Sequence, residues 1–100
     1  MVAVSSSGAR TALRIVVVGR VQGVGYRWYA RECGRRLLIA GHVSNQPDGT
    51  VLVEAAGSSQ SMQVFMEQLR SGPGPATVAD LRTEALASDA RLPDPFSISR

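Results

Sequence analysis

A chain of 100 residues, with 44% hydrophobic and 19% charged residues, has the size and composition of one globular domain with its own core. The single cysteine and the single histidine exclude an internal disulfide and a structural zinc site built from these side chains. No apolar stretch approaches the length needed to span a bilayer, so we expect no contact with a membrane.

The first ten residues predict a flexible N-terminal lead-in, and residues 11–100 are expected to form the single domain. Residues 1–8 contain no basic region and no long apolar run, which argues against a signal peptide. The lone cysteine points in the same direction, because it favours a reducing compartment. Together these features predict a cytoplasmic protein.

Charge is distributed unevenly, and each of the 11 basic residues is an arginine. Residues 1–36 contain seven arginines against Glu32 alone, whereas residues 37–100 contain four arginines against seven acids. A positive first half favours an anionic ligand. Nucleic acid fits this charge less well, because the longest run of consecutive basic residues is Arg35-Arg36.

The first half of the chain predicts a strand followed by a helix. Thr11 to Val18 is rich in β-branched residues, which is typical of a strand. From Tyr26 to Leu38 the apolar positions recur at helical spacing. Cys33 lies on that apolar stripe, and no histidine is near it in sequence, so we interpret it as a core residue and not as a nucleophile.

The second half predicts a hairpin, a helix and two further strands. The expected elements are strands at 40–46 and 50–57 around a Pro47-Asp48-Gly49 turn, a helix capped by Ser58 or Ser59 and running to about Arg70, a loop at 71–75, a strand from Thr77 to Leu86, a loop at 87–95 and a short strand at 96–99. The order β-α-β-β-α-β with a short terminal strand is the split β-α-β pattern of an α+β, ferredoxin-like sandwich. We therefore expect an antiparallel sheet with two helices on one face.

A glycine-rich turn, Gly19-Arg20-Val21-Gln22-Gly23-Val24-Gly25-Tyr26-Arg27, joins the first strand to the first helix. Glycine permits positive φ and a helix N-terminus offers unpaired N–H groups, so with the Arg27 guanidinium the turn predicts a cradle for an anion. The alternative is a tight turn with a solvated arginine. Neither a Walker A loop nor a dinucleotide fingerprint matches, because no Gly-Lys-Ser/Thr follows and Trp28 stands at the third glycine position.

This turn and the hairpin together resemble two motifs of the acylphosphatase family. The turn is similar to G-x-V-Q-G-V-x-[FY]-R, and Gly41-His42-Val43-Ser44-Asn45 with Gly49-Thr50-Val51 is similar to G-[FYW]-V-x-N-x-x-x-G-x-V. The resemblance covers about residues 12–99, and two long motifs at the right separation are more specific than either alone. His42 and Ser44 depart from the aromatic and basic residues usual in the family, which affects local packing and substrate entry but not the reaction.

The resemblance implies a hydrolase that cleaves the carboxyl-phosphate anhydride of small-molecule acyl phosphates into a carboxylate and inorganic phosphate. It implies no metal, no cofactor and no covalent intermediate, and we expect a monomer. The phosphate would be bound by Arg27 together with backbone N–H groups of the loop residues Gln22, Gly23, Val24, Gly25 and Tyr26. Arg20, in contrast, is expected to be a solvated residue at the end of the strand.

Asn45 matches the asparagine that orients the attacking water in the family. An amide can hold a water molecule in line with the scissile bond without titrating. From position alone, Asn45 could equally be a turn residue before Pro47. His42 is set aside as a general base, because strand alternation places it on the face opposite Asn45.

Two alternatives use the same fold. A ferredoxin-like sheet can bind RNA through aromatic residues on its open face, but three of the five aromatic residues are Tyr26, Trp28 and Tyr29, in the predicted helix. A maturation or regulatory domain could retain the fold while serving a larger protein, although the length of the chain favours a free-standing enzyme. Hydrolysis of a model acyl phosphate, compared with RNA binding, would separate these functions.

Overall fold

The structure is a computed structural model that describes residues 9–87 and 90–99. Most of the expected lead-in, and two residues of the expected loop at 87–95, lie outside the described residues. The elements in chain order are β1 (Arg10–Arg20), α2 (Tyr26–Arg36), β2 (Ala40–Asn45), β3 (Val51–Ser58), α3 (Ser59–Ser71), β4 (Thr77–Ala85) and β5 (Ser97–Ile98). The expected types and order of elements are confirmed. No helix in the described ranges is long and apolar enough to cross a membrane.

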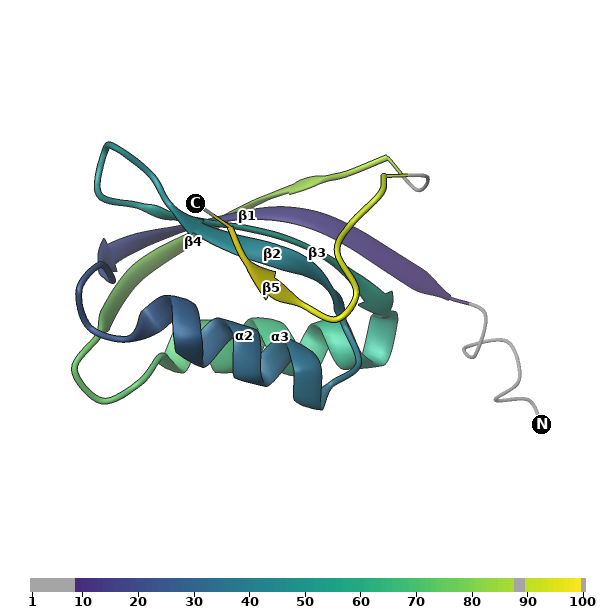
Figure 1. Ribbon diagram of the computed structural model, residues 1–100, viewed down its shortest axis with the longest axis horizontal. Coiled ribbons are helices and arrows are strands. Elements are labelled where there is room, and N and C mark those ends of the chain that lie inside the picture. Colours follow the sequence, from purple (N-terminus) through teal and green to yellow (C-terminus); the bar gives the residue numbers. More distant parts are fainter. Residues whose placement is uncertain (1–8, 88–89, 100) are drawn as a thin grey trace.

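The five strands form one sheet in the order β4-β1-β3-β2-β5, with both helices packed on one face (Figure 1). The four main strands pair antiparallel, as expected for a ferredoxin-like α+β sandwich. The short β5 pairs parallel with β2, so the sheet is mixed at this edge. The C-terminal segment reaches the start of β2 first, where Gly41 N donates to the Pro93 carbonyl. It then runs alongside β2 in the same direction as far as Ser99, which makes β5 parallel to β2.

Two elements end two residues away from the predicted position, and the other ends that differ shift by one residue. β1 continues past Val18 through an irregularity at Gly19, whose φ of +141° few other residues adopt. α2 ends at Arg36, two residues before the predicted end, because Leu38 has a φ of +58° that is incompatible with a right-handed helix. At the start of α3, the Ser58 hydroxyl accepts a hydrogen bond from Ser61 N at 3.1 Å, which confirms Ser58 as the cap.

The core lies between the sheet and the two helices. Its fully buried members come from every main layer, among them Ile15, Val17, Tyr26, Ala30, Val43, Val53, Met62, Phe65, Leu69 and Phe96. The rings of Phe65 and Phe96 meet edge to face, with their centroids 5.7 Å apart. A Cβ at Gly34 would lie 2.7 Å from the Phe96 ring, so the glycine that weakens α2 is what lets the C-terminal segment pack closely.

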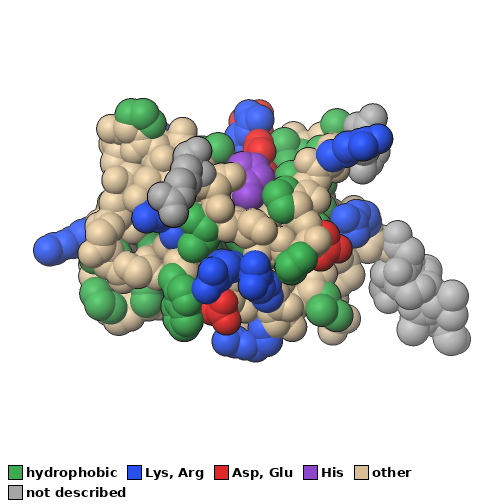
Figure 2. All heavy atoms as spheres, viewed as in Figure 1, with side chains coloured by type: hydrophobic (Ala, Val, Ile, Leu, Met, Phe, Trp, Pro, Cys, Tyr) green, Lys and Arg blue, Asp and Glu red, His purple; other side chains and the backbone are tan. Residues whose placement is uncertain are grey.

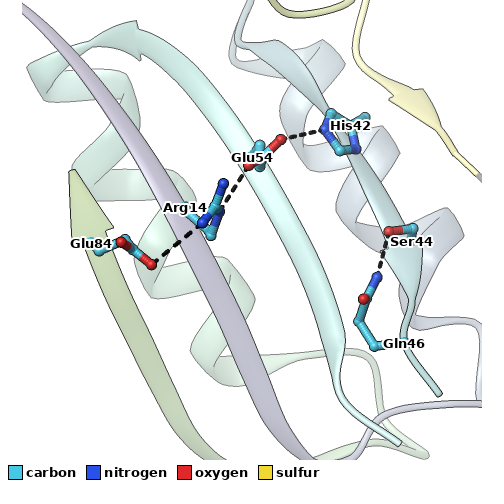
Figure 3. Close-up of polar contacts among 6 residues, drawn as sticks. All are labelled: Arg14, His42, Ser44, Gln46, Glu54 and Glu84. Atoms are coloured by element: carbon cyan, nitrogen blue, oxygen red, sulfur yellow. Dashed lines mark hydrogen bonds and ion pairs between the residues drawn. The ribbon is translucent and has the colours of Figure 1, made fainter. Parts of the chain in front are cut away.

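The opposite face of the sheet carries charged side chains that pair with one another (Figure 3). Arg14 Nε lies 2.9 Å from Glu54 Oε2, and Arg14 Nη1 lies 3.6 Å from Glu84 Oε1. His42 Nε2 lies 2.8 Å from Glu54 Oε1. Burial disfavours the charged form of Glu54, but hydrogen bonds from Arg14 and His42 outweigh it and hold the pKa of this carboxyl below its usual value. His42 therefore takes part in a network of hydrogen bonds and ion pairs across the four strands β2, β3, β1 and β4.

Candidate active site

The glycine-rich turn between β1 and α2 lies at the same end of the molecule as the β2–β3 hairpin turn (Figure 1). A pocket of about 170 Å³ lies there, lined by Val21, Gly23, Gly25, Tyr26, Arg27, Trp28, Asn45 and Ile98. It brings together two residues that are far apart in the sequence, Arg27 and Asn45. Of the other predicted site residues, Gly23, Gly25 and Tyr26 line the pocket, whereas Gln22 and Val24 do not.

The two loop glycines are explained by backbone conformation and not by crowding. Gly23 has a φ of +75° and Gly25 a φ of +81°, values that other residues adopt only with strain. A Cβ at either position would meet no atom within 4 Å. Positive φ is the reason for glycine that the sequence analysis gave, and the backbone geometry agrees with it.

The N-terminus of α2 opens onto this loop without a capping side chain. The N-cap residue, Gly25, has no side chain that could cap the helix, and no acidic residue occupies the first turn. Tyr29 N donates to the Gly25 carbonyl at 3.0 Å, whereas the N–H groups of the first turn have no intrahelical acceptor. These N–H groups and the positive end of the helix dipole favour an anion at this position.

Tyr26 fixes the position of this helix end. Its side chain is buried, and its hydroxyl donates to the Leu69 carbonyl of α3 at 2.7 Å. Burial raises the pKa of the Tyr26 phenol well above its usual value, so this side chain stays neutral. One turn further on, the Tyr29 hydroxyl donates to the Gln68 carbonyl at 2.9 Å. Because both tyrosines hold α2 on α3, Arg27, which lies between them, starts from a fixed backbone.

Among the described residues, Arg27 and Asn45 have no side-chain partners of the kind found on the opposite face of the sheet. Arg27 is partly buried and forms no ion pair within the described part of the chain. Asn45 is exposed at the end of β2, where it pairs with Val51 in the register of the hairpin. At the edge of one pocket, a guanidinium can bind an anion and an amide can hydrogen-bond a water molecule.

Gln22 has a role that the sequence analysis missed. Its side-chain Nε2 donates to the Gln46 carbonyl at 2.8 Å and to the Thr50 carbonyl at 2.9 Å. These carbonyls lie on the two arms of the hairpin turn, so one amide ties the glycine-rich loop to the strand that carries Asn45. The sequence prediction considered only the backbone N–H of Gln22. No spacing rule indicates this side-chain contact, because it depends on the packed sheet.

The turn itself is stabilised by its own side chains. Asp48 Oδ1 accepts hydrogen bonds from Thr50 N at 3.0 Å and from Thr50 Oγ1 at 2.7 Å, which lowers the pKa of the Asp48 carboxyl. The nearly buried Ser44 hydroxyl accepts from Gln46 Nε2 at 3.0 Å (Figure 3). Asp48 is thus a turn residue. Ser44, which stands where a basic residue is usual in the family that the sequence resembles, forms a local hydrogen bond instead.

Other reactive side chains lie away from the pocket. His42 contacts Glu54 on the open face of the sheet, as strand alternation predicts. Cys33 is buried, and burial raises the pKa of its thiol, which fits a core residue. Among residues 9–87 and 90–99, no group of three or more His, Cys, Asp or Glu side chains is arranged to hold a metal ion.

Comparison with known proteins gives a consistent result. The family model described as acylphosphatase matches residues 13–98. An acylphosphatase of Rhizobium etli is 39% identical over 88 residues, which cover 88% of this chain and 93% of that protein. The crystal structure of acylphosphatase from Bacillus subtilis superposes with a TM-score of 0.84 at 34% identity, over 89% of this chain and 98% of that one. An acylphosphatase structure from Coxiella burnetii has the same TM-score at 27% identity, over 99% and 100% of the two chains.

Proposed function

Because the chain belongs to the acylphosphatase family and is an acylphosphatase, we propose that Arg27 binds the phosphoryl group of its substrate and that Asn45 orients the water that attacks it. The observation that carries this proposal is the pocket at the uncapped N-terminus of α2, which Arg27 and Asn45 line together. Figure 2 adds that basic side chains gather over α2, the helix that also contains Arg31, Arg35 and Arg36.

The phosphoryl oxygens would accept hydrogen bonds from the Arg27 guanidinium and from backbone N–H groups of residues 22–26. A guanidinium matches two phosphoryl oxygens at once and offsets the charge on the transferring group. The uncapped helix end adds donors that are already oriented, so little reorganisation is needed when charge develops. Gln22 contributes through its side chain as well, because it fixes the loop against the hairpin.

Asn45 would hold the water on the side of the phosphorus atom opposite the leaving carboxylate. The water oxygen forms a new bond to phosphorus while the bond from phosphorus to the acyl oxygen breaks, and the carboxylate leaves with that electron pair. Among the described residues that line the pocket there is no His, Asp or Glu, so in our proposal the water proton passes to an oxygen of the transferring phosphate. Positioning and charge stabilisation supply the acceleration.

The proposal also covers the localisation, the oligomeric state and the size of the substrate. We expect the enzyme to act as a cytoplasmic monomer on a small-molecule acyl phosphate, as the sequence predicts. RNA binding gains no support from the open face of the sheet. The five aromatic residues lie elsewhere: Tyr26, Trp28 and Tyr29 on α2, Phe65 on α3 and Phe96 in the core.

Hydrolysis of acetyl phosphate by the purified protein tests the proposal. We expect turnover in the parent, and a loss of about 10²–10³ in kcat for Arg27→Ala, by analogy with the removal of other oxyanion donors. The matched control is Arg20→Ala, because Arg20 is exposed and does not line the pocket, so its turnover should stay near that of the parent. Similar losses in the two variants would indicate a diffuse basic field and would refute the assignment of Arg27.

A further inference from the structure

Trp28 is the one large apolar side chain that is both exposed and part of the pocket, among the residues that the structure describes. The exposed large hydrophobic residues there are Trp28, Leu38 and Val64. Single exposed apolar residues are common on protein surfaces, so exposure by itself indicates nothing. Trp28 differs from the other two because it follows Arg27 directly and borders the same pocket, with 59% of its surface exposed.

Ile98 adds a second apolar group to the pocket from the opposite end of the chain. Its strand is held in place on both sides. Ser99 N donates to the Val43 carbonyl at 2.8 Å, and Arg35 Nε of α2 donates to the Phe96 carbonyl at 2.7 Å. The C-terminal segment therefore forms a fixed part of the pocket.

The size of the pocket decides which part of a substrate it can enclose. Its volume of about 170 Å³ is well below the roughly 300–1,000 Å³ that is usual for sites that enclose a drug-sized ligand. A phosphoryl group held by Arg27 and the loop would occupy the inner part. The acyl group, which varies between substrates, would then lie at the mouth, next to the exposed indole of Trp28.

We propose that Trp28 and Ile98 form the acyl subsite of this pocket and select acyl phosphates with an aromatic acyl group. This inference rests on the proposed function, because it assumes that Arg27 holds the phosphoryl end. An indole offers an aromatic acyl group a flat surface for offset stacking or an edge-to-face contact, and Ile98 adds an aliphatic contact. A small acyl group such as acetyl reaches neither surface to the same extent.

The first test compares benzoyl phosphate with acetyl phosphate by the ratio of their kcat/KM values. In Trp28→Ala this ratio should fall about tenfold relative to the parent, because an aromatic pair contributes up to about that factor in affinity. Trp28→Phe should keep most of the ratio. The matched control is Val64→Ala, which shortens an exposed apolar side chain on α3 outside the pocket and should leave the ratio unchanged. An unchanged ratio in Trp28→Ala would overturn the subsite.

The second test needs no turnover. Trp28 is the only tryptophan of the chain, so its fluorescence reports directly on the proposed subsite. With inorganic phosphate present, benzoate should change the emission in a saturable manner, and acetate should have little effect at the same concentrations. Identical, unsaturable responses to benzoate and acetate would refute the aromatic subsite.

Together with the turnover of Arg27→Ala, these tests distinguish a failure of the acyl subsite from a failure of the proposed function. If Arg27→Ala retains the turnover of the parent, the phosphate site is wrong, whatever the fluorescence shows. If Arg27→Ala loses turnover while the substrate ratio ignores Trp28, the phosphate site stands and only the acyl subsite fails.

Discussion

Arg14 and Arg27 are the same residue type on consecutive elements, yet their surroundings differ completely. Arg14, on β1, contacts carboxylates on both neighbouring strands, with Nε 2.9 Å from Glu54 and Nη1 3.6 Å from Glu84. Arg27, on α2, forms no ion pair within the described part of the chain and lines a pocket at a helix N-terminus. A cation with protein partners contributes to the folded state, whereas a cation without them is available to a ligand.

Two polar residues of β2 repeat this contrast. His42 lies 2.8 Å from Glu54 on the open face, and Asn45, three residues later, lines the pocket. On residue type alone, His42 is the stronger catalytic candidate, because histidine is a common acid or base in enzymes. Position in the sheet reverses that ranking. In the function that we propose, the groups that act on the substrate are a guanidinium and an amide without side-chain partners among the described residues.

The largest expected effects come from removing each of the two arginines in turn. Arg27→Ala should reduce kcat by about 10² or more and leave the free energy of unfolding near that of the parent. Arg14→Ala should do the opposite: turnover is kept, while the free energy of unfolding falls because Glu54 loses a hydrogen-bond donor. Acyl phosphate hydrolysis and urea denaturation of both variants measure this. A loss of turnover in Arg14→Ala equal to that in Arg27→Ala would contradict the division.

The link between the loop and the hairpin can be broken at Gln22. A carboxylate at this position cannot donate to the Gln46 and Thr50 carbonyls, so Gln22→Glu should separate the loop from the strand that carries Asn45. We expect kcat to fall roughly ten- to a hundredfold, as small misplacements of catalytic groups commonly cause. The control is Gln63→Glu, the same chemical change at an exposed position on α3. Equal turnover in the two variants would show that the Gln22 clamp, the two hydrogen bonds from Gln22 to the hairpin, is irrelevant to the reaction.

The ionic network should govern acid stability and not turnover. The pKa of Glu54 lies below its usual value in the folded protein, so its contribution is present above about pH 4.3 and is lost as the pH falls through the folded pKa. Glu54→Gln should therefore lower the free energy of unfolding at pH 7 by on the order of 1 kcal/mol, and the difference from the parent should shrink in acid. Urea denaturation at several pH values measures it. A constant difference at all pH values would contradict the linkage.

Apart from the effect of the substrate's own ionisation, turnover should be nearly flat between about pH 5 and 8, because the proposed site consists of a guanidinium and an amide, side-chain types that do not change charge there. His42→Gln should retain this profile, since His42 contacts Glu54 and not the pocket. A limb near pH 6.5 in the parent that disappears in His42→Gln would show that the histidine is the base after all.

The sequence predicted most of the fold because its signals are local. The β-branched run before Gly19, the apolar stripe through Tyr26 and Cys33, and the Ser58 cap each depend on a few neighbouring residues. What it missed depends on contacts between distant segments. The parallel pairing of β5, the packing of Gly34 on Phe96 and the Gln22 clamp arise only when the sheet is assembled.

For the site, the motifs predicted which residues take part, but not the contacts that hold them in place. The resemblance indicated Arg27 and Asn45, and the structure places both at one pocket. The sequence analysis considered Trp28 as the residue at the third glycine position and as one of the aromatic residues of the predicted helix, but not as part of the site, although it borders the same pocket. Its exposure could not be read from the helical pattern, because helical periodicity indicates which positions face the core and not what the remaining positions meet.

The separation of roles between Arg27 and Asn45 is the central claim, and binding of inorganic phosphate tests it most directly. Calorimetric titration of the parent, Arg27→Ala and Asn45→Ala with inorganic phosphate measures the ground-state affinity without any chemical step. We expect Asn45→Ala to bind phosphate within about a factor of two of the parent while its kcat falls about 10²-fold or more, because its partner is the water. Arg27→Ala should lose phosphate binding and turnover together. A loss of phosphate affinity in Asn45→Ala as large as that in Arg27→Ala would contradict the claim.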